Sequence, residues 1–352
     1  MKRFITILLL LTGLTSSNFA QDGHLSQFYM SPLYVNPALC GVFNGKFRVA
    51  LNYREQWSTV LKVNPFRAAY AGFESRFKIV GDDYFSVGLN VLNDATGAAQ
   101  FNQRRGYLTI SYMKQLQGSR YRTNDQYIIA GAQLGAGQNT IDANKLWFSR
   151  QFDGTTNTPN PGQLSSGETF PDGSTSSSLF IGFNAGLMYY ALFGKSNSIY
   201  FGGAMQHINQ PKIALFDNSK EVLNRKWTIH AGGQLSMTDE LSLLPSVLYQ
   251  QQNQLLEILL GTNIRYSNQD WDELAIRAGV WTRINNRLGD SKQLEAFIIS
   301  GLIEIQRWNI GLSYDITSST LRQANNGRGA FEVSLMYIHP EKSNYKVSCP
   351  KF

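Results

Sequence analysis

Charged residues, cysteine and long apolar runs are all scarce in this chain of 352 residues. Only 16% of the residues are Asp, Glu, Lys or Arg, and there are two cysteines. An average soluble protein has about 25% charged residues. Beyond the N-terminus, no apolar run reaches the roughly 18 residues that mark a membrane-spanning helix. The sequence therefore excludes a helical membrane protein.

Aromatic residues and glycine are abundant instead. The chain has 21 Phe, 17 Tyr, 6 Trp and 31 Gly, and 43% of its residues are hydrophobic. This composition is incompatible with disorder, which requires few apolar and aromatic residues. The formal charge of +7 contains no dense run of Lys or Arg, so a nucleic-acid surface is not indicated. The combination suits the β-barrel of an outer membrane, whose strands are only half apolar.

The N-terminus has the features of a secretory signal peptide. A basic start, Met1 to Arg3, precedes an apolar stretch from Phe4 to Leu14 that is too short to span a bilayer. A small residue, Ala20, marks the expected cleavage site. The sequence therefore predicts a signal peptide over residues 1–20 and a mature chain from Gln21. Because position 21 is not Cys, no N-terminal lipid anchor is expected.

An alternation of apolar and polar residues with period two extends from residue 46 to about 339. Successive side chains of a strand point to opposite faces, so each such run has one apolar and one polar face. The pattern predicts about fourteen strands, an even number as in single-chain bacterial barrels. Twelve or sixteen strands remain open, and Pro245 suggests a bulge or a wrong assignment in its strand. The predicted strands are 46–57, 65–77, 84–92, 104–114, 126–137, 178–190, 197–206, 226–236, 240–250, 254–266, 273–284, 292–302, 305–316 and 328–339.

The resulting fold class is all-β, a transmembrane antiparallel β-barrel over residues 46–339. Residues 21–45 form a short irregular segment, either periplasmic or a plug, and residues 340–352 form a periplasmic tail. The long connections, such as 138–177 and 93–103, mostly alternate with short turns, as in outer-membrane barrels with extracellular loops. Both termini are then expected in the periplasm. The open alternative is a soluble β-sandwich, but Tyr and Trp residues near the predicted strand ends favour a bilayer-interface girdle.

The search for chemistry gives no catalytic, cofactor-binding or metal-binding residues. The four histidines form no His-Glu-x-x-His pair, and no phosphate loop or nucleophile elbow is present. The sequence therefore predicts neither an enzyme nor a cofactor. Several charged residues have the parity of the barrel interior, where they pair across the lumen or tune a pore: Arg48, Arg54, Glu257, Arg277 and Arg283.

Both ends of the mature chain resemble the PorP/SprF family of type IX secretion proteins. Residues 24–41 read HLSQFYMSPLYVNPALCG, and residues 53–57 read YREQW. The far end reads GLSYDI at 311–316, GAFEVSL at 329–335 and CPKF at 349–352. Ser31, where Asn is common in the family, and Cys40 before Gly41 depart from the pattern. The family-motif residues that are candidates for partner contact are Gln27, Pro32, Leu33, Asn36, Pro37, Tyr53, Arg54, Gln56 and Trp57.

The resemblance implies an outer-membrane accessory barrel of the type IX secretion system. Such proteins support secretion or surface attachment of large adhesins used in gliding motility. The implied partners are outer-membrane lipid, a secreted adhesin or its C-terminal signal domain, and other secretion components, among them a periplasmic peptidoglycan-binding protein. The alternative is an outer-membrane channel or transporter for small or apolar solutes.

The two cysteines flank the predicted barrel. Cys40 lies before the first strand and Cys349 after the last, and those strands are neighbours in a closed barrel. If both face the oxidising periplasm, a disulfide between them is feasible. Two free thiols are the alternative.

Overall fold

The computed structural model describes most of the predicted barrel. The residues described are 22–61, 64–118, 124–146, 148, 151–153, 158–159, 175–194, 196–215, 221–268, 274–286 and 292–340. The predicted signal peptide and most of the C-terminal tail lie outside these residues.

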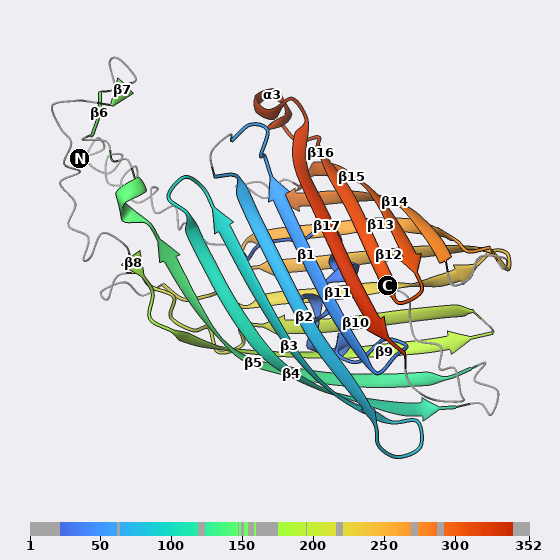
Figure 1. Ribbon diagram of the computed structural model, residues 1–352. Helices are drawn as coiled ribbons and strands as arrows, with labels where there is room; N and C mark the ends of the chain where they lie inside the picture. The colour runs from blue at the N-terminus through green and yellow to red at the C-terminus, as the bar shows by residue number, and fades with distance from the viewer. Residues whose placement is uncertain are drawn as a thin grey trace, which may run out of the picture.

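Fourteen long strands form one closed antiparallel barrel (Figure 1). The first and last strands close it with an unbroken register, from Phe47 opposite His339 to Gln56 opposite Ala330. The predicted fold class and strand number are therefore confirmed. The strands are β1 (Phe47–Gln56), β2 (Phe66–Lys78), β3 (Tyr84–Thr96), β4 (Phe101–Gln117), β5 (Gln126–Ile141), β9 (Phe180–Phe193), β10 (Asn197–Gln206), β11 (Lys226–Ser236), β12 (Leu241–Gln252), β13 (Leu255–Tyr266), β14 (Leu274–Asn286), β15 (Lys292–Ile305), β16 (Trp308–Thr317) and β17 (Arg328–His339).

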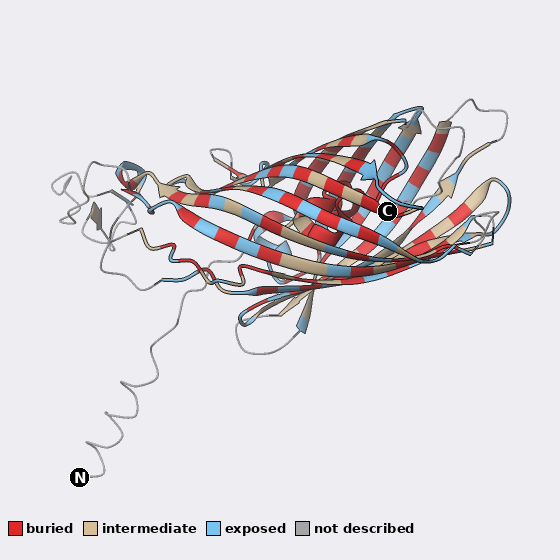
Figure 2. Ribbon diagram, turned by 90° about the horizontal axis from the view of Figure 1, so that it is seen from below, coloured by how far each residue is buried: buried red, intermediate tan, exposed pale blue. Residues whose placement is uncertain are grey.

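The barrel is apolar outside and polar inside. Figure 2 shows exposed and buried residues alternating along each strand. In β16, Leu312 is 50% exposed on the outer wall, whereas Ser313 and Asp315 are 3% and 2% exposed in the interior. The period-two pattern of the sequence has thus placed its apolar face outward, as a lipid-facing wall requires.

The two ends of the barrel differ in their connections. At the end that we call the long-loop end, residues 207–225 join β10 to β11, and 318–327, with the short helix α3 (Arg322–Asn325), join β16 to β17. The connection from β5 to β9 contains four short described elements: η3 (Ala143–Lys145), β6 (Phe152–Asp153), β7 (Thr158–Pro159) and β8 (Thr175–Ser176). The opposite, short-turn end has turns such as 306–307 and also holds the start of β1 and the end of β17.

Two predictions about the strands are corrected. The expected long loop at 93–103 is wrong, because β3 and β4 extend into it and leave only residues 97–100 as a turn. Gly97 adopts a left-handed φ of 72° there. Pro245 causes no bulge: the β11–β12 ladder is interrupted beside it and resumes in the same register, while β12–β13 pairing continues opposite Thr262. A missing N–H removes a hydrogen bond without shifting the strand.

Aromatic residues gather on the outer wall at the short-turn end. Phe47 lies 5.9 Å from Tyr337, and Trp308 lies 4.7 Å from Tyr337, between ring centroids. This cluster fits an interfacial girdle. The expectation that Tyr and Trp residues of the strands form such a girdle is wrong for Tyr84, Tyr190 and Trp281, which point inward and are only 2–3% exposed.

Three short helices precede the barrel: η1 (Phe28–Met30), α2 (Pro32–Val35) and η2 (Pro37–Leu39). They lie inside the ring of strands (Figures 1 and 2). Proline fits the first position of a helix because it lacks an N–H to satisfy, and Pro32 and Pro37 hold this position in α2 and η2. Among the described helices, none has the length and apolarity needed to cross a bilayer.

Candidate functional site

Residues 22–45, which we call the plug, run through the barrel from one end to the other. Asp22 donates its backbone N–H to Gln252, the last residue of β12 at the long-loop end. Gly45 lies against the carbonyl of His339 at the short-turn end. The described starts of the plug and of the tail are therefore at opposite ends of the barrel.

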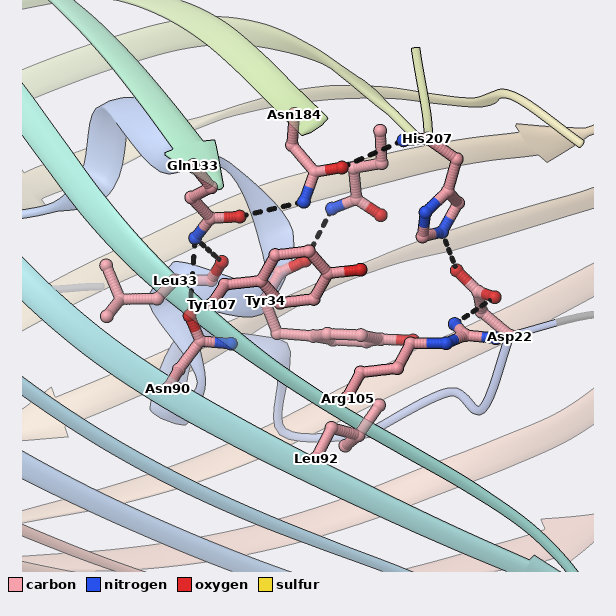
Figure 3. A pocket seen from close by; sticks show the side chains of 11 residues that line it. Asp22, Leu33, Tyr34, Asn90, Leu92, Arg105, Tyr107, Gln133, Asn184 and His207 are labelled. Atoms are coloured by element: carbon pink, nitrogen blue, oxygen red, sulfur yellow. Dashed lines mark hydrogen bonds and ion pairs between the residues drawn. The ribbon is translucent and has the colours of Figure 1, made fainter. Parts of the chain in front are cut away.

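A cluster of buried charges fixes the first residue of the plug (Figure 3). The Asp22 carboxylate pairs with Arg105 and with His207, whose Nε2 lies 2.8 Å away, and Lys226 Nζ is 3.9 Å away. Arg105 and Lys226 supply positive charge beside this carboxylate, and His207 lies at hydrogen-bond distance from it. Asp22 thus anchors the plug to Arg105 of β4 and Lys226 of β11.

A second cluster holds the start of the motif. Both oxygens of Glu332, a side chain with 0% exposure, accept backbone N–H groups of the plug: from Ser26 at 2.7 Å and from Gln27 at 2.9 Å. The Asp315 carboxylate accepts from the Ser26 hydroxyl at 2.8 Å and from Arg283 at 2.8 Å. Carboxylates that accept backbone N–H groups in a buried setting form strong, directional bonds.

Arg54, the motif arginine, belongs to this second cluster. It pairs with Asp315 at 2.8 Å and with Glu332 at 3.5 Å, and it donates to the Ser26 hydroxyl. Removing one member would leave a buried charge unpaired, which is strongly destabilising. Two motif segments that are 28 residues apart in sequence thus bind each other: the segment around Ser26 in the plug and the segment around Arg54 in β1.

The middle of the plug lies against glycines of the wall. Asn36 caps η2 by accepting from Ala38 N–H at 2.8 Å, and its amide donates to the carbonyls of Leu187 and Gly203 on β9 and β10. A Cβ at Gly186 would lie 2.0 Å from Asn36 Oδ1. The wall therefore needs glycine where the Asn-Pro turn approaches it.

Near the short-turn end, a carboxylate of the wall again accepts a backbone N–H group of the plug. Glu74 of β2 accepts the Gly41 N–H at 2.7 Å and pairs with Arg48 at 2.7 Å. The Arg48 guanidinium lies 4.8 Å from the ring of Phe43. Carboxylates of β17 and β2 thus hold the plug at two places, at Ser26 and at Gly41.

Apolar contacts fill the space between these polar clusters. Trp281 of β14 packs edge-on against Phe28 at 5.5 Å and stacks on Tyr29 at 5.6 Å. Beside the part of the plug near the long-loop end there is a cavity of about 10 Å³, lined by Asp22, Tyr34 and Arg105 among others. Such a volume holds about one water molecule. Phe28, Tyr29 and Trp281 are all buried at the contact between plug and wall.

The candidate partner-contact residues occupy different positions. Gln27, Pro32, Leu33, Asn36 and Pro37 are buried in the plug, and Arg54 is buried in the wall. Their role in partner contact stays a prediction; the contacts that the structure gives them hold plug and wall together.

Three further motif residues lie at or near the end of β1. Tyr53 faces outward at 41% exposure, Gln56 pairs opposite Ala330, and Trp57 turns the chain with a φ of 59° and packs 5.1 Å from Phe66. These half-exposed residues form part of the long-loop rim.

The five charged residues assigned to the interior from sequence all face inward. Sequence reasoning missed their partners, chiefly Glu74, Glu304, Asp315 and Glu332. The signal was available, because these acidic residues stand at the polar positions of alternating strands. Which residue each one binds depends on the path of the plug, which has no periodicity.

The cysteine prediction falls partly outside the described residues. Cys40 is 1% exposed inside the barrel. Cys349 lies outside the described residues, so their pairing stays a prediction. No group of three or more potential metal ligands occurs among the residues described.

Several solved structures of barrels are similar to this chain. The monoaromatic hydrocarbon channel CymD has 11% sequence identity and a TM-score of 0.45, with 89% of this chain and 94% of that chain covered. The Ralstonia pickettii toluene transporter TbuX has 12% identity, coverage of 87% and 91%, and a TM-score of 0.45. A Pseudomonas aeruginosa FadL homologue has 12% identity, coverage of 87% and 93%, and a TM-score of 0.44. A search of curated proteins gave no match.

The sequence itself matches a family model over residues 17–337, which include the plug and the fourteen strands except for the last two residues of β17. The match confirms the resemblance seen in the terminal motifs. The closed barrel and the family together indicate an outer-membrane location. The chain belongs to the PorP/SprF family of type IX secretion system membrane proteins.

Proposed function

We propose that this protein is a non-enzymatic accessory barrel that supports secretion or surface attachment of large adhesins by binding protein partners. The observation that carries the proposal is the family match over residues 17–337. The plug supports it, because a barrel whose lumen holds a segment bound by buried ion pairs and hydrogen bonds is poorly suited to passive conduction. Partner binding then falls to the rims and the outer wall.

The proposal includes an orientation. We place the short-turn end in the periplasm, as in outer-membrane barrels generally. The end of β17 then lies on the periplasmic side, near other secretion components such as a peptidoglycan-binding protein. The start of the plug lies at the outer mouth, which revises the expectation that both termini face the periplasm.

A deletion strain tests the function. Loss of the gene should remove at least one large surface protein from the cell surface, with defective spreading or adhesion, while other outer-membrane barrels stay at normal abundance. Quantitative mass spectrometry of surface-exposed proteins measures this. Tagged full-length protein, purified from gently solubilised membranes, should carry a secreted adhesin or secretion components with it.

The solute-channel alternative has a clear signature. A deletion strain that exports every surface protein normally but loses uptake of a solute would replace the proposed function. A purified full-length barrel that conducts small solutes, and has no protein bound, would support the same conclusion.

A further inference from the structure

The outer wall has a hollow over strands β1 to β5, towards the long-loop end. Its volume is about 870 Å³. The hollow arises where small residues stand on nearby strands. Gly106 of β4 stands opposite Ala136 of β5 and, on its other side, opposite Val91 of β3. Val91 in turn stands opposite Ala71 of β2. Leu51 and Leu179 flank it and are 43% and 72% exposed.

The neighbouring rows of the wall are chemically different. Two residues further from the long-loop end, Leu108 pairs with Leu89 and Leu134, and all three are 48–65% exposed. Two residues nearer to that end, Arg104 stands opposite Asn93 and Gln138. Along the outer face of β4, the order is thus large apolar, small, then cationic and polar.

Arg104 is an exposed cation at the polar edge of the hollow. Its Nε donates to Asn93 Oδ1 at 3.4 Å, a long hydrogen bond. No carboxylate pairs with it among the residues described, in contrast to Arg67 on β2, which pairs with Glu55 at 3.4 Å. A guanidinium offers a planar fork of donors that matches a phosphate.

We propose that this hollow is a binding site for one anionic phosphorylated lipid of the membrane. An acyl chain lies over Gly106 and Ala136, where the wall recedes, and the phosphate of the headgroup is bound by Arg104 with Asn93 and Gln138 beside it. Charge complementarity selects this occupant, because Arg104, which has no carboxylate partner among the residues described, stands at the end where the apolar surface stops. The inference is independent of the role in secretion.

Native mass spectrometry of the full-length barrel tests the site. The probes are phosphatidylglycerol and phosphatidylcholine with identical acyl chains. The wild type should retain one phosphatidylglycerol in preference to phosphatidylcholine. Arg104→Gln should weaken phosphatidylglycerol retention about tenfold, the order expected for a lost charge-assisted contact, and should remove the headgroup preference. Arg67→Gln should keep both.

A second pair of variants tests the hollow itself. Gly106→Leu fills it, and the fold can accept a Cβ there, since the nearest atoms would be 3.5 and 3.8 Å away. Gly301→Leu is the matched control on the opposite part of the sheet, at an exposed position with nothing within 4 Å. Gly106→Leu should lose the retained lipid and Gly301→Leu should keep it. Heat-modifiable migration checks that each variant is folded.

Three outcomes would overturn the proposal. Equal lipid retention by the two leucine variants would remove the hollow as the site. An unchanged phosphatidylglycerol preference in Arg104→Gln would remove the phosphate assignment. Loss of a co-purified protein in Gly106→Leu, with lipid retention unaffected, would show that the hollow is a protein contact instead.

Discussion

At the scale of single residues, buried carboxylates decide where the plug sits. Glu332 and Glu74 accept backbone N–H groups of the plug, and Asp22 of the plug itself binds Arg105 and His207 of the wall. A buried donor that loses its acceptor costs about 1–3 kcal/mol. A few side chains therefore control a segment of more than twenty residues.

Glu332→Ala should loosen the plug without opening the barrel. The backbone N–H groups of Ser26 and Gln27 lose their acceptor, and Arg54 loses one of its two carboxylate partners. We expect faster hydrogen exchange over the first part of the plug, measured by mass spectrometry on detergent-solubilised protein. The control is Glu304→Gln, since Glu304 pairs with Arg265 and Arg277 on the wall. Equal exchange in the two variants would contradict the anchoring role.

Cys40 should be unreactive in the folded protein. Its side chain is 1% exposed inside the barrel, so a thiol reagent cannot reach the sulfur. We expect no modification by a maleimide before unfolding. After unfolding without a reductant, mass mapping tests the predicted Cys40–Cys349 bond: two alkylated thiols would rule it out. Rapid modification of Cys40 in the native barrel would contradict its position inside the lumen.

At the scale of elements, the plug and the strands fit together through glycines. Asn36 reaches the wall only because Gly186 lacks a side chain. The same short helices would find no room in a barrel lined with larger residues at this level. The position of the plug is thus a property of β9 and the plug together.

Gly186→Ala should displace the plug and raise conductance. The added Cβ would lie 2.0 Å from Asn36 Oδ1, so the Asn-Pro turn must move away from β9. Single-channel recording in planar bilayers should show current for this variant and none for the wild type. Gly203→Ala on β10 is the control, because its Cβ has only the Thr228 carbonyl nearby, at 3.7 Å. A silent Gly186→Ala barrel, or a conducting wild type, would contradict a lumen closed by the plug.

At the scale of the whole molecule, the chain crosses the barrel before its first strand begins. The plug starts among the long loops and ends beside the end of β17. The N-terminal and C-terminal ends of the described chain are therefore separated by the height of the barrel. With the proposed orientation, they lie on opposite sides of the membrane.

Epitope tags should reveal this separation. A tag inserted directly before Asp22 should be accessible to antibody or protease on intact cells, whereas a tag after residue 352 should become accessible only after the outer membrane is permeabilised. Surface labelling with both tagged strains provides the measurement, and an extracellular-loop tag in the 207–225 connection serves as a positive control. Protection of both terminal tags in intact cells would contradict the proposed path.

The sequence by itself determined the barrel, its strand number and its outward face. These features depend on a period-two pattern, and alternation along a strand is a local property that each segment carries alone. It also determined the family, through the motifs around Gln27 and Arg54. The charged residues that face the lumen could also be assigned from the sequence, since the parity of a position along a strand decides the face to which its side chain points.

Only the tertiary structure decided what these residues do together. The path of residues 22–45 has no periodicity, so their place inside the barrel depends on long-range contacts such as Asn36 with β9 and Ser26 with Glu332. The hollow at Gly106 likewise needs the register of β3, β4 and β5, because small residues form a depression only when they stand side by side. Contacts between distant segments are fixed by the closed ring of strands, and that ring exists only in three dimensions.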